Sequence, residues 1–500
     1  MKLTNTEQKI CNFLRETCEQ HSPETVPRIA GGWVRDKLLG KESHDIDVAI
    51  NNMTGRDFVN LVRIHARLCD VNFCEGFVVT ARPEQSKHLE TASCRLLGQE
   101  IEFTNLRKET YTDETRIPSM KFGTPREDAT RRDLTINSMF FNIMTEKVED
   151  FTLMGLSDLE HKIIRTPCDP VQTFLDDPLR VLRTIRFAVR FGFSVHPDTL
   201  YAASIDEVKE AFLSKVSKER IWMEMIGVQE RDGWKKGFLT GPNPSEALSL
   251  IDSFMFHEVL FEPSGLSLMP WNADQNNHHH DLNIWDHTNL AFKHLTTRMP
   301  LPDDPEERAV RHLAVILHDL GKRDPEFRQL KENGENSFHQ HEVRSAELAE
   351  IVLSNLSAPN SIKDRVVKLI REHCRFHHIE QGNASDKAFR KLARDIGDDI
   401  GNLIDISEAD GYGKKYKWDK PDVKNFFDSC RDRMAKVLSE QGNQKKIERP
   451  ISGHDLKAIG IAPGPEMGRL FKALDEELLD TPQMTREEAL DFVRSLSSDS

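Results

Sequence analysis

Strand-forming segments are concentrated in the first 150 residues of this 500-residue chain, and that distribution limits the folds open to it. From Arg28 to about Asn142, short apolar and β-branched runs alternate with helical stretches, which is typical of an α/β unit. Beyond Asp150 the strand signals almost disappear and leucine-rich helical periodicity takes their place. A chain of this length also exceeds one hydrophobic core, so roughly three or four packing units are expected. The sequence therefore predicts an α+β protein of several domains, with a strand-containing head followed by all-helical parts.

Breaks in composition predict where these domains meet. The stretch from Glu262 to His280 is rich in proline, glycine, asparagine and histidine, and Gly442 to Lys446 indicates a second break. The expected parts are a head at 1–150, a helical neck and body at 151–262, a second helical domain at 281–437 and a helical tail at 447–500. Within the head, strands are predicted at 45–50, 77–81, 100–106 and 138–144.

Composition narrows the classes of protein that the chain can belong to. Hydrophobic residues make up 38% and charged residues 30%, which is typical of a globular protein and not of a disordered one. No apolar run has membrane-spanning length, and the segment from Met1 to Gln20 lacks the apolar core of a signal peptide, so we expect no membrane partner and a cytoplasmic location. The eight cysteines are scattered without a CxxC pair, which argues against a disulfide framework or a zinc knuckle. No oligomeric state is predicted.

The charge balance restricts how the chain can bind a nucleic acid. Lys and Arg number 68 and Asp and Glu 82, which gives a net charge of −14, so any contact with phosphates has to be local. Arg180, Arg183, Arg186 and Arg190 recur at spacings that place them on one face of a helix. This basic stripe suits RNA binding, and it equally suits a solvated helix face with intrahelical ion pairs.

Asp45 and Asp47 have the spacing of a metal site. Standing two residues apart in a predicted strand, their carboxylates project from the same face, while Ile46 and Val48 face the core. Carboxylates this close repel each other unless a cation neutralises them, and Mg²⁺ held by two carboxylates and substrate phosphates is the usual solution. Glu102, in a second alternating strand, can supply a third carboxylate. Taken alone, the pair of aspartates also fits a solvated strand edge or a turn.

The residues before this strand suit a phosphate group. Gly31 and Gly32 form a turn without side chains, through which the backbone can approach a triphosphate, and the helix that follows carries Arg35 and Asp36. The whole segment GGWVRDKLLGKESHDID resembles the first motif of class II CCA-adding enzymes and bacterial poly(A) polymerases, in the polymerase-beta-like nucleotidyltransferase superfamily. The resemblance implies a mixed-sheet nucleotidyltransferase head and Mg²⁺-dependent, two-metal transfer from CTP or ATP to the 3′-hydroxyl of tRNA, with release of pyrophosphate.

Further motifs of this family follow in order. RRDLTINSM (131–139) resembles the ribose-recognition motif, and FLDDPLRVLRTIRFAVRFGF (174–193) resembles the motif that reads the incoming base through protein side chains. Asp177 and Arg180 carry that second role in the family, and an Asp acceptor with Arg donors can complement the Watson–Crick edge of cytosine or adenine. The resemblance thus implies that Asp45 and Asp47 are catalytic carboxylates, and the strand position of Glu102 makes it the third candidate. The resemblance also implies that nucleotide is bound by Gly32, Arg35, Arg132, Asp133, Asn137, Asp177, Arg180, Arg183 and Arg186.

Three other segments bear on the same resemblance. SKERIWMEM resembles a helix-stabilising motif in which Arg220 and Glu224 form an intrahelical ion pair at i, i+4, and we expect that pair to be structural. The segment from Glu109 to Glu127 resembles the flexible loop linked to the switch from C to A addition. Leu153 stands where relatives tend to have a glycine, in the hinge after the head.

The second half of the chain carries histidines and aspartates suited to a metal. They occur in RHLAVILHDLGK, HQHE, REHCRFHH and SEADGYGK, on predicted helices or at their ends, and such groups from separate helices form metal sites in helical domains. Their order resembles the HD phosphohydrolase superfamily and the C-terminal domain of some bacterial CCA-adding enzymes. The resemblance implies a divalent metal held by His287, His318, Asp319 and Asp410, with His341 and His373 as candidates for a second metal or a phosphate. It also implies hydrolysis of phosphomonoesters or 2′,3′-cyclic phosphates.

Four functions fit these motifs. The resemblance favours addition and repair of the CCA end of tRNA. A poly(A) polymerase of the same fold shares every motif of the head and differs in how it controls its substrate. A noncatalytic RNA-binding or regulatory protein that kept the fold is another possibility, against which the intact Asp45, Asp47, Asp177 and Arg180 argue. The last is an HD nucleotide phosphohydrolase with a noncatalytic RNA-binding head.

Overall fold

The computed structural model describes residues 1–43, 45–79, 91–112, 115–230, 233–276, 282–380, 386–414, 420–442, 449–478, 481 and 483–498. The chain forms two compact units, Met1–Glu262 and Pro263–Ser500. The predicted break at 442–446 and the end of the predicted linker at 277–280 lie mainly outside the described residues. None of the helices among the described residues is long and apolar enough to cross a membrane.

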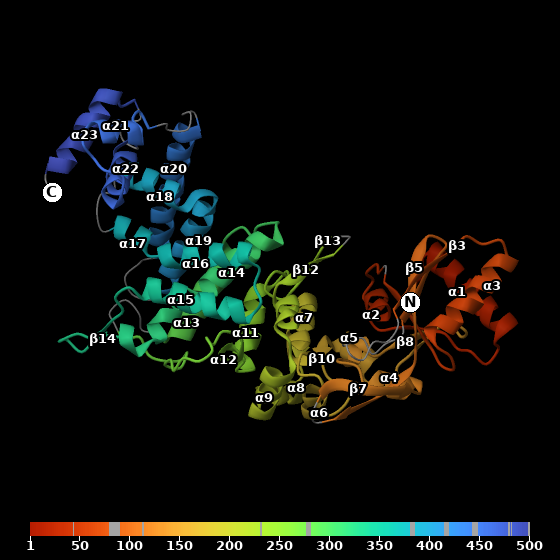
Figure 1. The fold of residues 1–500 in the computed structure, drawn as a ribbon. Coiled ribbons are helices and arrows are strands. Elements are labelled where there is room, and N and C mark those ends of the chain that lie inside the picture. Colours follow the sequence, from red (N-terminus) through yellow and green to blue (C-terminus); the bar gives the residue numbers. More distant parts are fainter. Residues whose placement is uncertain are drawn as a thin grey trace. The chain divides into compact units, whose positions relative to one another are not determined.

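A seven-stranded mixed sheet forms the head of the first unit (Figure 1). β2 and β5 pair in parallel, and every other neighbouring pair in this sheet is antiparallel. In spatial order its strands are β3 (Phe73–Val79), β4 (Thr91–Leu96), β5 (Gln99–Asn105), β2 (Ile46–Ile50), β1 (Arg28–Ala30), β8 (Phe140–Asn142) and β9 (Lys147–Glu149). A mixed sheet of this kind agrees with the predicted head.

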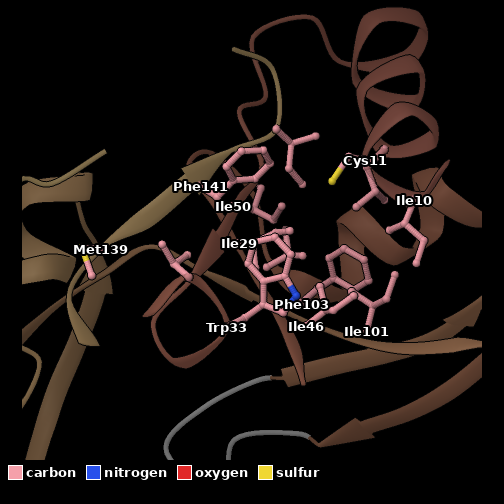
Figure 2. Packing of buried hydrophobic residues seen from close by; sticks show 14 of the residues in the cluster. Ile10, Cys11, Ile29, Trp33, Ile46, Ile50, Ile101, Phe103, Met139 and Phe141 are labelled. Carbon is pink, nitrogen blue, oxygen red and sulfur yellow. The ribbon is translucent and has the colours of Figure 1, made fainter. Parts of the chain in front are cut away.

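Three helices complete the core of the head. They are α1 (Asn5–His21), α2 (Gly32–Leu38) and α3 (Gly55–Leu68). A capping box between Thr4 and Glu7 begins α1, and α3 packs on β4 and β5 and also contacts α1. Figure 2 shows the apolar side chains that meet between these elements. They include Ile10 and Cys11 from α1, Trp33 from α2, Ile46 and Ile50 from β2, Ile101 and Phe103 from β5, and Phe141 from β8.

Several strands of the head have no clear sequence signal. The strands predicted at 45–50, 100–106 and 138–144 correspond to β2, β5 and β8, and the one predicted at 77–81 overlaps β3 up to Val79. A separate hairpin of β6 (Arg107–Thr112) and β7 (Thr115–Phe122) lies where a loop was predicted. Its first strand is almost entirely polar, so it lacks the alternation by which a half-buried strand is recognised.

The rest of the first unit is mainly helical, as the periodicity predicts. Two short two-stranded sheets interrupt the helices, one parallel and one a hairpin that the sequence did not indicate. The helical elements are α4 (Pro125–Thr130), η2 (Thr135–Asn137), α5 (Gly155–His161), α6 (Pro170–Asp176), α7 (Arg180–Phe191), α8 (Pro197–Ser204), α9 (Asp206–Lys215), α10 (Lys218–Met225), α11 (Pro244–Ser253) and α12 (His257–Leu260). The strands are β10 (Ile163–Ile164), β11 (Ser194–Val195), β12 (Gly227–Glu230) and β13 (Gly233–Lys236).

Where the structure describes it, the second unit has one short hairpin, β14 (Gln329–Leu330) with β15 (Asn336–Ser337), and its other named elements are helices. Its first helices are α13 (Ile284–Arg298), α14 (Pro305–Leu317), η3 (Leu320–Arg323), η4 (Pro325–Phe327), α15 (His341–Asn355), α16 (Asn360–Glu372) and α17 (Arg375–Glu380). They continue with α18 (Asp386–Ile396), η5 (Gly397–Asp399), α19 (Ile400–Gly413) and α20 (Lys420–Gly442). The C-terminal helices α21 (Gly453–Ala458), α22 (Pro465–Leu478) and α23 (Arg486–Ser498) pack around an apolar core of their own.

Leu153 has an unusual backbone conformation for its residue type. It lies between β9 and α5 with a φ of +62°, and its side chain is 84% exposed. A left-handed conformation costs a residue with a Cβ roughly 1–2 kcal/mol, which glycine avoids. This strain gives a physical reason for the glycine that the resemblance implies at this position.

Replacing Leu153 by glycine is therefore expected to leave the free energy of unfolding of the first unit unchanged or to raise it by up to about 1 kcal/mol. The same change at Leu156, an exposed residue inside α5, is expected to lower it by about 1 kcal/mol because glycine disfavours a helix. Urea-dependent hydrogen exchange of peptides covering residues 147–165 measures both. A greater loss from Leu153→Gly than from Leu156→Gly contradicts the interpretation.

Candidate active sites

A cavity of about 820 Å³ opens in the first unit and is lined by the head sheet, by α2 and by the helices that follow. All nine residues predicted to bind nucleotide line it, and so do the three predicted catalytic carboxylates. The structure thus brings together in one cavity residues that lie up to about 150 positions apart in the sequence, from Gly32 to Arg186.

The carboxylates of the cavity lie on two neighbouring strands. Asp47 on β2 is directly opposite Glu102 on β5 in the parallel register, and Asp45 immediately precedes β2. Ile46 and Val48 are buried beneath them, as the two-residue period requires. Desolvation raises the pKa of Glu102, and the nearby charge of Asp47 raises it further. The pKa of Asp47 is also raised, by desolvation and by Asp45, against the opposing effect of Arg132.

This donor set fits a hard divalent cation. Asp45 raises the pKa of Asp47, and both aspartates raise the pKa of Glu102, so these carboxylates are close enough to repel, and a cation between them removes that cost. Oxygen donors from carboxylates are the ligands that Mg²⁺ prefers, together with substrate phosphates.

A glycine turn and the helix after it bring the backbone close to this acidic surface. Gly31 has a φ of +69°, and a Cβ there would lie 2.8 Å from the Arg132 guanidinium and 3.3 Å from the Asn137 carbonyl. Neither the conformation nor the space suits any other residue. α2 then begins at Gly32 and directs Arg35 towards Asp36 and Asn137, to both of which the guanidinium donates hydrogen bonds.

A chain of polar contacts connects the head with α7. Asn137 Nδ2 donates to Asp133 Oδ1 at 3.1 Å, and Arg183 Nε donates to Asp133 Oδ2 at 2.8 Å. Burial alone would raise the pKa of Asp133, but Arg183 and Asn137 stabilise the carboxylate and lower its pKa to about 2. Arg183 also lies 3.6 Å from Glu224. The residues predicted to recognise ribose are therefore held in one orientation by each other.

The partners of Arg220 and Glu224 differ from the prediction. The expected intrahelical pair is wrong, because Arg220 contacts Asp177, at 2.9 and 3.3 Å, and Glu224 accepts from Arg186 at 2.5 Å. The i, i+4 spacing allows a pair within α10, but each residue has a stronger tertiary partner. Arg220 consequently fixes the carboxylate of Asp177, while Arg180 donates to the backbone carbonyls of Arg131 and Thr173.

Many residues of the cavity wall were absent from the predicted site, and Arg190, Met223 and Lys235 are three of them. Arg190 belongs to the basic stripe of α7, so its position follows from the spacing already noted. Met223 on α10 and Lys235 on β13 also line the cavity. The hairpin that carries Lys235 has no sequence signal for a binding site, and only its place in the fold reveals it.

In the second unit, four buried side chains form a cluster that we call the HD cluster: His287, His318, Asp319 and Asp410. His287 Nε2 lies 3.2 Å from His318 Nε2 and 3.1 Å from Asp410 Oδ1. Asp319 Oδ2 is 3.2 Å from the first ring and 3.3 Å from the second. Donor atoms about 3 Å apart are the edges of a coordination shell with bonds of roughly 2.1 Å.

Local structure explains how the sequence brings these four groups together. His318 is the C-cap residue of α14, and its Nδ1 donates to the Val315 carbonyl at 2.7 Å, which directs Nε2 into the cluster. Asp410 comes from α19, which approaches closely because residue 413 is glycine. A Cβ at Gly413 would lie 2.5 Å from the ring of His287.

The electrostatics of the HD cluster favour positive charge. Burial alone would lower the pKa of His318, but Asp319 and Asp410 raise it to about 10. The pKa of Asp319 lies well below its usual range despite burial, because His318 and Lys322 stabilise the carboxylate. A divalent cation can take the place of the imidazolium proton, so the chemistry of this donor set fits a metal.

Beside the HD cluster lie His341, His373 and Cys374, whose donor atoms also fall within 4.8 Å of one another. We call these three residues the Cys374 cluster. Both histidines were predicted as candidates for a metal or a phosphate, whereas the cysteine was not predicted. Burial and the charge of His318 lower the pKa of His373 to about 4, so this imidazole is neutral at physiological pH.

Comparison with known proteins agrees with this description. The Poly A polymerase head domain family matches residues 27–165, and the HD domain family matches residues 280–412. The chain is 33% identical to the mitochondrial CCA tRNA nucleotidyltransferase of Candida glabrata over 99% of its own length and 96% of the relative's. It belongs to the CCA tRNA nucleotidyltransferase family.

Other members of the family are similar along most of the chain. The mitochondrial CCA tRNA nucleotidyltransferase of Saccharomyces cerevisiae is 31% identical over 99% of this chain and 93% of its own length. A solved structure of the Thermotoga maritima CCA-adding enzyme complexed with tRNA has the same fold, with a TM-score of 0.57 and 17% identity over 100% of this chain and 97% of that one. The nucleotidyltransferase and HD families depend on divalent metal ions.

Proposed function

We propose that this chain adds and repairs the 3′-terminal CCA of tRNA, using CTP and ATP and releasing pyrophosphate. The cavity of the first unit carries the proposal, because it places three carboxylates in the same space as the arginines of α7. The relatives' names describe CCA tRNA nucleotidyltransferases, and the Thermotoga maritima enzyme was solved with tRNA. An arginine-lined cavity gives an acidic protein the local positive surface that phosphates need.

Mg²⁺ is proposed at Asp45 and Asp47, with Glu102 alongside. Bound there, it would lower the pKa of the attacking 3′-hydroxyl and offset charge on the leaving pyrophosphate. The chain itself holds the carboxylates on one sheet face and presents the backbone of Gly31 and Gly32 to the triphosphate. Positioning and charge stabilisation of this kind account for most of the catalysis in transfer from a triphosphate.

Selection of the nucleotide is proposed to depend on two groups of residues. Asp133 and Asn137, fixed by Arg183 and Arg35, face the ribose, and Asp177 with Arg180 reads the base. Because Arg220 contacts the carboxylate of Asp177, we assign Arg220 as a positioning residue for base recognition. Arg132 and Arg186 complete the cavity wall towards the phosphates.

The first test uses a tRNA transcript that ends at the discriminator base, Mg²⁺, and labelled CTP and ATP. We expect the wild type to add C, C and A and then stop, as resolved on a sequencing gel. Replacing both Asp45 and Asp47 by alanine is expected to lower the rate about 1000-fold or more, because the cation loses its ligands. Long A tails from the wild type would replace this proposal by a poly(A) polymerase.

A matched pair of variants separates the effect of losing the Glu102 carboxylate from the effect of a change in strand β5. Glu102→Gln is expected to lower kcat about 100-fold, since one carboxylate of the cavity is lost. Glu100→Gln, on the same strand but outside the cavity lining, is expected to change little. Equal losses from both would assign the effect to β5 and not to the site.

The role of Arg220 is testable through Asp177. Arg220→Lys keeps the positive charge but loses the bidentate contact with Asp177. We therefore expect kcat/KM for CTP and ATP to fall about 10- to 100-fold, with more incorporation of UTP. If Arg220 acts through Asp177, the double variant Asp177→Asn/Arg220→Lys is no worse than Asp177→Asn. Fully additive losses would show that Arg220 acts separately.

For the second unit, we propose hydrolysis of phosphomonoesters or 2′,3′-cyclic phosphates, a reaction that would clean damaged RNA ends. The HD cluster supports this, with a divalent metal held by His287, His318, Asp319 and Asp410. Such a metal would activate water for attack on phosphorus. Lys322 and Lys414 lie 2.7 and 3.1 Å from the cluster's carboxylates, where their ammonium groups can meet a phosphate.

Substitution in the HD cluster is expected to separate the two activities. His318→Ala should abolish Mn²⁺- or Ni²⁺-supported hydrolysis of RNA ending in a cyclic phosphate and leave CCA addition intact, because the residue belongs to the other unit. His339→Ala, an exposed histidine two positions from His341, is the control and should retain hydrolysis. Hydrolysis that survives in His318→Ala would contradict the proposal.

From the composition we also propose that the protein is located in the cytoplasm. Two of the relatives are named as mitochondrial enzymes, so fractionation of cells with compartment markers is the appropriate test.

A further inference from the structure

The stretch from Met269 to Asn276, which composition predicted to be part of a linker, is hydrogen-bonded to two elements beside the HD cluster. We call this stretch the strap. Its first residue exchanges two hydrogen bonds with Arg323 of η3, at 2.8 and 2.7 Å. Further along, the Ala273 carbonyl accepts from the first N–H of α13 at 3.3 Å. α13 carries His287 and η3 directly follows Asp319, so the strap connects the segments of two predicted metal ligands.

Gln275 of the strap is fully buried, and its side-chain amide has one possible orientation. Nε2 donates to the Leu282 carbonyl at 3.2 Å, and Oε1 accepts from Lys322 Nζ at 3.0 Å. A carbonyl can only accept and an ammonium group can only donate, so exchanging the two ends of the amide would break both contacts. The Gln275 backbone carbonyl also accepts from Asn336 Nδ2 at 3.0 Å. The side chain and the backbone of this residue are therefore both fixed.

The ammonium group of Lys322 lies at the edge of the HD cluster, among neighbours from three segments. Nζ is 2.7 Å from Asp319 Oδ2 and 5.8 Å from the centre of the Phe338 ring, and Gln275 Oε1 is the neighbour from the strap. The side chain of Lys322 is 5% exposed. A buried ammonium group is stable only with partners that replace its water. These contacts therefore set the directions of its N–H groups.

A neutral acceptor beside Lys322 has a different consequence from a charged one. Asp319 already supplies one carboxylate, which also faces His287 and His318. A second carboxylate at position 275 would cancel the charge of the ammonium group and repel an incoming anion. The amide oxygen of Gln275 holds the ammonium group by a hydrogen bond and adds no negative charge. Lys322 consequently keeps its attraction for a phosphate.

We propose that Gln275 is a positioning residue of the HD cluster, which orients the Lys322 ammonium group so that it donates to a phosphate oxygen of an RNA end. The proposal rests on the hydrolysis proposed for this cluster and names the contact through which the site holds its substrate. Gln275 itself touches Lys322 and not the phosphate. Phosphomonoesters and 2′,3′-cyclic phosphates both carry non-bridging oxygens, so one ammonium group serves either substrate.

The experiment measures the binding of inorganic phosphate to the full-length protein loaded with Mn²⁺ or Ni²⁺, by isothermal titration calorimetry. Gln275→Met is close in volume but has no acceptor, and it is expected to weaken phosphate binding about tenfold. Gln275→Glu is expected to weaken it at least as much, because Lys322 then faces a second carboxylate. The KM for RNA ending in a cyclic phosphate should rise by the same factor, with unchanged metal content by atomic absorption. Asn272→Ala, at an exposed position of the strap, is the control and should match the wild type.

A double variant separates positioning from a purely structural role. If Gln275 acts through Lys322, Gln275→Met/Lys322→Met binds phosphate no more weakly than Lys322→Met. Fully additive losses, or wild-type phosphate binding in Gln275→Met, overturn the proposal. A Gln275→Met protein that loses its metal does the same, since Gln275 would then hold the cluster together. If Gln275→Met is unstable, Gln275→Glu supplies the comparison, and wild-type phosphate affinity in that variant also overturns the proposal.

Failure of this proposal is distinguishable from failure of the hydrolysis proposal. If the protein has no hydrolytic activity but Gln275→Met weakens phosphate binding, the hydrolysis proposal falls and the positioning role in phosphate binding stays. Hydrolysis by Gln275→Met with a wild-type KM does the reverse. A wild type that neither binds phosphate nor hydrolyses the RNA overturns both.

Discussion

The repulsion between carboxylates on neighbouring strands is the constraint around which the first unit is arranged. Parallel pairing of β2 with β5 places Asp47 directly opposite Glu102, with Asp45 next to them. Asp45 raises the pKa of Asp47, and both aspartates raise the pKa of Glu102. Such a surface is costly without positive charge close by. The arginines of α7 line the same cavity, and the contacts through Asn137 and Asp133 hold that helix against the head. Substrate phosphates and metal ions would complete this charge balance.

The parts of the site that the sequence could predict are those governed by short-range geometry. A two-residue spacing in a strand fixes the common face of Asp45 and Asp47, and a spacing of three or four in a helix fixes the basic stripe. The order of motifs then indicated which distant segments belong together, and the structure brings them into one cavity. The hairpins β6–β7 and β12–β13 were missed because their sequences, such as RKETYT in β6 and GWKK in β13, are mostly polar and have no alternation of apolar and polar residues.

The contacts that depend on tertiary packing could not be predicted from the sequence. Arg220 and Glu224 have the spacing of an intrahelical pair, yet each pairs with a residue about 40 positions away, and nothing local distinguishes the two outcomes. Cys374 was set aside because metal-binding cysteines usually come in close pairs, whereas here the other donors come from separate helices. In both cases the competing long-range partner is visible only once the helices are packed.

Two metal-site histidines of the second unit, His318 and His373, lie at helix ends, and this position affects more than the orientation of their rings. His318 and His373 are the C-cap residues of α14 and α16, helices that pack against each other, and each ring is anchored to its own last turn. Fraying of either turn would pull a donor atom away from its cluster. By mass action, any ion bound there stabilises those helix ends, so the metal supply of the cell would set how often this part of the protein opens.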